Sequence, residues 1–233
     1  LKYSSDPYDQ GAFPDTHVTY YRYAFQWPAD KKVRMRIQGQ MPFGRYMTFN
    51  VYDRDTRTSL GSFPDSQIMS ETGHHEPVKE GEKYSVWLTQ QHDPLLRNQV
   101  VLPQRPGLIF EVWYRIYLPQ KNELGGVGLP ELEFYEENGM IPAPPSLPPL
   151  SAKSVGLKDF RKLPPRPTTE GDVYFYAAPG FGFYNNKDNQ YLVSRLDFSK
   201  GKDFLLLSFK SPRFGRKGGA LNPEVRYFSF CLG

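Results

Sequence analysis

The sequence contains a single cysteine, Cys231, so no disulfide can form within the chain, and the CxxC spacing of zinc or haem sites is absent. Its longest purely apolar run is the short segment 204–207, whereas a membrane-spanning helix needs about 20 apolar residues. It also lacks a GxSxG motif, which presents the nucleophile of many hydrolases. We therefore expect neither a transmembrane segment nor a cofactor.

Histidine is scarce as well, and the four histidines are poorly spaced for a metal. His74 and His75 are adjacent in a turn-rich loop beside Glu76, and adjacent side chains do not converge on one ion. The other two, His17 and His92, are distant in the sequence, although His92 precedes Asp93. These patterns favour a solvated loop over a metal site.

Charge is nearly balanced, with 29 Lys and Arg against 25 Asp and Glu and a pI near 9.0. This mild basic excess is weaker than the dense positive field of a nucleic-acid-binding protein, but it allows an acidic partner. The chain begins with Leu1, and its first residues lack the apolar core of a signal peptide. We expect a processed, exported protein, located in the periplasm.

Aromatic residues are abundant at 15%, there are 22 prolines and 20 glycines, and helical periodicity is missing. Segments 33–39 and 46–53 alternate apolar and polar residues, which is typical of a strand with one face in the core and the other, here with Thr48 and Asn50, in water. Segment 107–119 is the longest predicted strand, and segment 174–184 suggests two strands joined by a Pro-Gly turn. The composition predicts an all-β protein.

One short sequence motif occurs twice in the chain. PFGRYMTF at 42–49 matches PRFG at 212–215 followed by RYFSF at 226–230, with about ten inserted residues between the two parts. Upstream, Asp15 precedes Tyr20 by the same interval that separates Asn186 from Tyr191. The shared order predicts that residues 12–53 and 184–231 form superposable β units that arose by internal duplication.

Between the two copies lies a segment with eight prolines, residues 140–167. Proline has no amide donor and a fixed φ, so this segment is predicted to run as polyproline II and to join two units, 1–139 and 168–233. We favour a strap packed on the protein's own surface over a proline-rich ligand for a partner. The second unit is expected to be truncated at its C-terminus.

Four sequence segments together resemble a known group of proteins: PDTHVTYYRYAF, GRYMTFNVYD, GGVGLPELEF and NPEVRYFSFC. With its repeated RYxxF motif, the sequence resembles uncharacterised bacterial exported proteins of a domain-of-unknown-function type. The resemblance covers most of the chain and implies a jelly-roll-like sandwich. It implies no activity, because none of these motifs is a catalytic signature.

Few residues suggest catalysis. Cys231 lies in a predicted strand far in sequence from every histidine, so we expect a buried, reduced thiol rather than a nucleophile. Glu131 and Glu133 would project from one strand face roughly 7 Å apart, a spacing that a glycosidase could use. Alternating glutamates are also common on a solvated strand face, which is the interpretation we favour.

Two groups of residues are the candidate binding residues. The first is the two RY pairs, Arg45 with Tyr46 and Arg226 with Tyr227, which could form an anion or sugar site, although packing between sheets is favoured. The second is the glycine-rich loop 209–223, whose basic residues are Lys210, Arg213, Arg216 and Lys217.

Two functions are compatible with these features. We favour a non-catalytic accessory or scaffold subunit of a larger assembly, whose basic loop docks on an acidic surface of a partner, on a membrane-bound complex or on anionic lipid headgroups. The alternative is a ligand-binding or carbohydrate-active protein that uses an aromatic groove.

Overall fold

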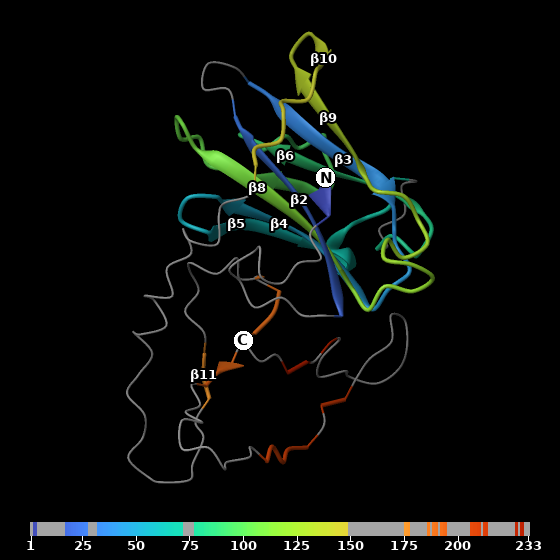
Figure 1. Cartoon of the computed structure of the whole chain (residues 1–233). Coiled ribbons are helices and arrows are strands. Elements are labelled where there is room, and N and C mark those ends of the chain that lie inside the picture. Colours follow the sequence, from blue (N-terminus) through green and yellow to red (C-terminus); the bar gives the residue numbers. More distant parts are fainter. Residues whose placement is uncertain are drawn as a thin grey trace.

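The described part of the protein is all-β, with two five-stranded sheets and one two-stranded sheet (Figure 1). The structure, a computed structural model, describes residues 2–3, 17–27, 32–71 and 77–148, together with the short segments 175–177, 186, 188–190, 192–194, 206–210, 212–213, 227 and 229–230. Within these residues the only helical element is the 3₁₀ turn η1, Asp65–Gln67. None of their helices is long and apolar enough to cross a membrane.

The first sheet has the order β1-β2-β8-β4-β5, and all of its neighbouring strands are antiparallel. Its strands are β1 (Lys2–Tyr3), β2 (Val18–Gln26), β8 (Ile109–Tyr117), β4 (Tyr46–Asp53) and β5 (Thr58–Pro64). The second sheet has the order β10-β9-β3-β6-β7, in which only β6 and β7 are parallel. Its strands are β10 (Gly139–Ile141), β9 (Glu131–Glu136), β3 (Arg34–Gln40), β6 (Lys83–Thr89) and β7 (Gln99–Val101).

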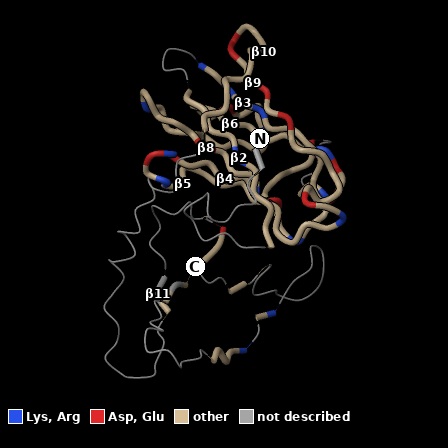
Figure 2. Tube along the Cα trace, viewed as in Figure 1, with Lys and Arg blue, Asp and Glu red and all other residues tan. Residues whose placement is uncertain are grey.

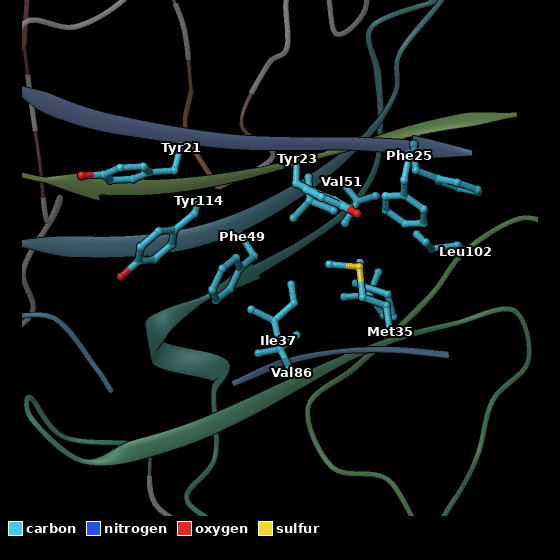
Figure 3. Packing of buried hydrophobic residues seen from close by; sticks show 14 of the residues in the cluster. Tyr21, Tyr23, Phe25, Met35, Ile37, Phe49, Val51, Val86, Leu102 and Tyr114 are labelled. Atoms are coloured by element: carbon cyan, nitrogen blue, oxygen red, sulfur yellow. The ribbon is translucent and has the colours of Figure 1, made fainter. Parts of the chain in front are cut away.

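The core lies between the two sheets and follows the predicted alternation. Met35 and Ile37 of β3 and Phe49 and Val51 of β4 are all buried in one apolar cluster, as are alternate residues of β8 (Figure 3). Aromatic rings form much of this core, and Phe49 stacks on Tyr114 with ring centroids 4.9 Å apart. Because the side-chain period of a strand is two, the alternating sequence predicted which residues face the core.

The outward-facing side of the first sheet is also buried, although its residues are largely polar. Thr48, Asn50 and Glu111 have no exposed surface, and Arg115 is buried beside three aromatic rings. Arg22 of β2 donates to the carboxylate of Glu111 on the adjacent strand β8. The sequence suggested a solvated face here, whereas the structure covers it with other parts of the chain.

The beginning of the proline-rich segment is hydrogen-bonded to the first sheet along strand β2. The Leu147 amide donates to the Ala24 carbonyl at 2.8 Å, and the Tyr23 hydroxyl donates to the Pro144 carbonyl. Arg54 donates to the Pro148 carbonyl. Residues 144–148 therefore pack on the protein's own surface, beside β2. The predicted unit boundaries at 139 and 167 stay predictions, because 149–174 lie outside the described residues.

Most of the predicted second unit lies outside the described residues, including Arg226 and Cys231. The described part contains one short antiparallel pair, β11 (Tyr176–Ala177) with β12 (Leu192–Val193). The predicted superposition of 12–53 on 184–231 and the predicted burial of Cys231 therefore stay predictions.

Candidate functional site

The structure brings two of the predicted ligand-binding residues to one place. The rings of Tyr46 and Tyr227 both contact Tyr117 of β8, each with its ring centroid 5.0 Å from that of Tyr117. Arg45 is only partly exposed, and its backbone amide donates to the Tyr117 carbonyl at 2.9 Å. Arg226, the remaining predicted residue, lies outside the described part of the chain. Tyr46 itself is buried, so its ring packs within the protein rather than presenting a stacking face.

A polar cluster surrounds these tyrosines on the outward side of the first sheet, and we call it the Asp188 cluster. Its members come from β4, β5, β8 and the segment after residue 185: Tyr46, Thr48, Asn50, Ser62, Tyr117, Asn186, Asp188 and Asn189.

Asp188 accepts hydrogen bonds from three hydroxyl groups of the sheet. The donors are Tyr46 at 2.8 Å, Thr48 at 3.0 Å and Ser62. Because a carboxylate that accepts from hydroxyl donors forms strong, charge-assisted bonds, this residue attaches its segment firmly to β4 and β5.

Asn186 is the buried member of the same segment, with only 1% of its surface exposed. Its side-chain oxygen accepts from Asn50 at 2.9 Å, and its amide nitrogen donates to the Tyr46 hydroxyl at 3.3 Å. Its donor and acceptor atoms are therefore both used inside the protein, which satisfies a polar group that would be costly to bury alone.

Electrostatics keep the Tyr46 hydroxyl protonated. Burial raises the pKa of Tyr46 strongly, and the nearby Asp188 carboxylate raises that pKa further. A phenol with a raised pKa is a hydrogen-bond donor and not a base at neutral pH. The Asp188 cluster is thus suited to attach a chain segment to the sheet rather than to move protons.

Sequence reasoning noticed Asn186 only as a marker of the repeat, and it missed Asp188 entirely. The usable signal was local: NNKDNQ at 185–190 is a dense run of short polar side chains, opposite a β4 strand whose non-core side is Tyr, Thr, Asn and Tyr. What the sequence did not provide was the contact between segments that are about 140 positions apart.

The predicted basic loop is only partly described. Lys210 and Arg213 are exposed, whereas Arg216 and Lys217 lie outside the described residues. The residues beside them are unexpectedly apolar for exposed positions: Leu206 is 80% exposed, Phe209 53% and Phe230 54%. The rings of Phe209 and Phe230 contact each other, with centroids 5.2 Å apart. We call this set the Phe209 patch, and its members are Leu206, Leu207, Phe209, Lys210, Arg213 and Phe230.

The candidate metal ligands do not come together in the described part of the chain. His17 and His92 are exposed, and no group of three or more His, Cys, Asp or Glu side chains suited to a metal occurs among the described residues. His74, His75 and Glu76 lie outside that part.

The two glutamates considered for acid and base catalysis lie on β9 and share one partner. The Gln38 amide donates to Glu133 at 2.7 Å and to Glu131 at 3.3 Å. Glu133 also accepts from the Tyr135 hydroxyl at 2.6 Å and lies 3.6 Å from Arg36. Glu133 is therefore part of a network of side chains on the second sheet.

Comparison with known proteins adds little to this description. No protein-family model matches the sequence, and no curated protein matches it. Among solved structures, an uncharacterized protein from Burkholderia cenocepacia is 13% identical with a TM-score of 0.39, over 63% of this chain and 35% of that one. The VPA0106 protein from Vibrio parahaemolyticus is 15% identical with a TM-score of 0.36, over 50% of this chain and 30% of that one. The chain thus spans about a third of the length of each of these bacterial proteins.

Proposed function

We propose that this protein is a non-catalytic accessory subunit that binds an acidic protein partner through the Phe209 patch. The observation that carries the proposal is the contacting pair Phe209 and Phe230, two rings that are each about half exposed beside Lys210 and Arg213.

The physical argument is the cost of leaving these side chains in water. Exposed single apolar residues are common, but contacting exposed aromatic rings with a basic border are typical of interface centres. Aromatic anchors supply most of the binding energy at such centres, and border charges mainly raise the association rate and select the sign of the partner. The positive charges of Lys210 and Arg213 favour a partner with an acidic surface.

The alternative function, ligand binding in an aromatic groove formed by the RY pairs, has less support. The aromatic surface around Tyr117 exists, but the chain's own Asn186, Asn189 and Tyr227 contact it. A ligand would have to displace these contacts before it could reach the tyrosines.

The finer features of the fold belong to the same proposal. We propose a jelly-roll-like sandwich that arose by duplication, and one register match supports it: β1 pairs with Tyr21 and Arg22, while β11 pairs with Leu192 and Val193. The paired residues are the first and second positions after Tyr20 in one copy and after Tyr191 in the other, and these two tyrosines are the matched residues of the repeat.

An exported, periplasmic location within a larger assembly is part of the proposal, and cell fractionation tests it.

The experiment is site-specific photo-crosslinking in the native host. A photoreactive phenylalanine analogue replaces Phe209 in one variant and Leu95 in another, since Leu95 is 89% exposed and lies outside the patch. We expect a discrete adduct with an acidic protein from position 209 and none from position 95. Purified partner should then bind more weakly when Lys210 and Arg213 are both replaced by Ser, with a weaker salt dependence.

Two results would reject the proposal. One is the same set of adducts from positions 209 and 95. The other is a partner whose affinity is unchanged in Phe209→Ser and in Phe230→Ser.

A further inference from the structure

The outward-facing side of the second sheet carries two aromatic side chains that meet across a strand. Trp87 of β6 and Tyr135 of β9 both reach over β3, which lies between their strands, and their ring centroids are 5.6 Å apart at an angle of 47°. Both residues are partly exposed. In Figure 1 the described C-terminal segments lie below the two sheets, on the side of β4 and β5 and far from β9 and β10. This aromatic pair is therefore on the layer that they leave uncovered.

Arginines of β3 hold the indole ring in place. The guanidinium carbons of Arg34 and Arg36 lie 5.9 Å and 5.7 Å from the Trp87 ring centroid. Arg36 is itself fixed, because its Nε donates to the Ser85 hydroxyl at 2.9 Å and its Nη2 donates to Glu71 at 3.2 Å. A ring held by such contacts loses little freedom when a ligand binds, which favours affinity.

Hydrogen-bonding groups border the two rings. Glu133 orients the Tyr135 ring, because its carboxylate accepts a 2.6 Å hydrogen bond from the Tyr135 hydroxyl. Glu131, which is exposed, lies next in line on β9, and Asp93 lies at the Arg34 end with its carboxylate 3.4 Å from that guanidinium. The site thus combines ring surfaces with carboxylate acceptors and arginine donors on rigid strands.

We propose that this face binds a neutral oligosaccharide. The C–H faces of a sugar ring pack on aromatic rings, and its hydroxyls donate to carboxylates and accept from arginines. Three carboxylates, Glu71, Asp93 and Glu133, contact the two arginines, and Glu131 lies further along β9, so the charge disfavours an acidic sugar. Figure 2 shows charges of both signs around this layer. The site is separate from the Phe209 patch and does not depend on it.

Tryptophan fluorescence provides the readout. The chain has three tryptophans, and Trp27 and Trp113 are only 4% and 3% exposed, whereas Trp87 is partly exposed. Acrylamide should therefore quench mainly Trp87, and a bound sugar should protect it. The probes are cellohexaose, xylohexaose, mannohexaose and maltohexaose, with an oligogalacturonate as the acidic comparison.

We expect saturable protection by at least one of the neutral hexasaccharides and weaker protection by oligogalacturonate. Tyr135→Ala should weaken binding by about tenfold, since an aromatic contact of this kind is worth about one factor of ten. Glu131→Ala, at an exposed position, should weaken it several-fold. Glu123→Gln, an exposed change on the loop between β8 and β9, and Phe209→Ser should leave it unchanged.

Three results would overturn the proposal: no protection by any neutral hexasaccharide, tighter binding of oligogalacturonate than of all neutral probes, or equal affinity in Glu131→Ala and the parent. Circular dichroism and thermal melting of each variant separate a lost contact from a lost fold. Because Glu131→Ala and Glu123→Gln alter exposed side chains, their comparison stays decisive even if Tyr135→Ala fails to fold.

Discussion

At the scale of single residues, the main feature is a set of polar side chains that are buried on the outward side of the first sheet. Arg22 and Glu111 form an ion pair there, and the Glu111 side chain has no exposed surface. A buried charge is tolerated only when it is paired, because removal from water costs several kcal/mol per ion. Removal of either Arg22 or Glu111 alone would therefore leave a buried charge without its partner.

The first prediction follows from this pairing. Glu111→Ala should lower the free energy of unfolding by about 3–5 kcal/mol, because it leaves the buried Arg22 guanidinium without its carboxylate. Urea denaturation followed by circular dichroism measures the change. Replacing both residues by apolar ones, Arg22→Met with Glu111→Leu, should recover much of the loss, since no uncompensated charge then remains.

An exposed ion pair supplies the matched control. Lys32 and Glu137 lie 3.8 Å apart with side chains 73% and 78% exposed. Glu137→Ala should change the unfolding free energy by less than about 1 kcal/mol, because solvent screens exposed pairs. Equal effects of Glu111→Ala and Glu137→Ala would contradict the importance of burial.

At the scale of elements, the segment 42–44 before β4 is held by the loop after β8, which needs glycine at position 125. Gly125 has φ +66°, and a Cβ there would lie 2.7 Å from the Phe43 carbonyl oxygen and 2.7 Å from Pro42. Its carbonyl accepts the Phe43 amide at 2.9 Å. The loop after β8 is thereby locked to the turn that leads into β4.

The second prediction concerns this contact. Gly125→Ala should destabilise the protein by about 2–3 kcal/mol, because it combines left-handed backbone strain with a clash against backbone atoms. Gly107→Ala is the control: Gly107 also has a positive φ, +76°, but nothing lies within 4 Å of a Cβ there, so only the strain of about 1 kcal/mol remains. If thermal melting shows equal losses, the clash at Gly125 is relieved by movement of the loop.

Sequence patterns predicted the strands better than the contacts between them. The alternation in β3 and β4 identified Met35, Ile37, Phe49 and Val51 as core residues, because a period of two depends on neighbouring positions alone. The same alternation suggested that Thr48 and Asn50 face water, and that was wrong. Whether a polar face is solvated depends on what else in the chain covers it, and no local pattern contains that information.

The candidate sites show the same limit. Tyr46 and Tyr227 were singled out as members of the two RY pairs, and both contact Tyr117. Asp188, which accepts a hydrogen bond from Tyr46, was missed because its partners are about 140 positions away. The Trp87 and Tyr135 pair was missed for a related reason. These residues lie on strands that are not neighbours, and only the sheet order places both over β3.

At the scale of the whole molecule, the protein is a two-layer structure with unlike outward faces. Residues of the segments 144–148 and 186–189 form hydrogen bonds with the first layer, and several polar side chains of that layer are buried. The second layer keeps its arginines, glutamates and two aromatic rings partly exposed. The two outward faces therefore differ in how much of their polar surface is in contact with solvent.

Buried tyrosines connect this architecture to pH. Burial raises the pKa of Tyr84 well above its ordinary value of 10.0, and it raises that of Tyr114, its neighbour in the core, and that of Tyr46 in the Asp188 cluster. A group whose pKa is raised on folding contributes stability that is fully present below the unfolded pKa and is lost as pH rises above it. The contribution of these tyrosines to stability should therefore be constant through neutral pH and fall above about pH 10.

The last prediction concerns how steeply the free energy of unfolding falls with pH, and which residues cause that fall. Above about pH 10 the unfolded chain releases three protons that the folded chain keeps, so the unfolding free energy should fall by about 4 kcal/mol per pH unit from these three tyrosines. Near-ultraviolet absorbance of tyrosinate, followed with circular dichroism, should show exposed tyrosines ionising first and the rest ionising only as the sheets unfold. Tyr114→Phe keeps the ring and removes one such proton, so its alkaline unfolding should begin at higher pH and proceed less steeply. Ionisation of all 16 tyrosines in one step near pH 10 with the fold intact would contradict the burial of these hydroxyls.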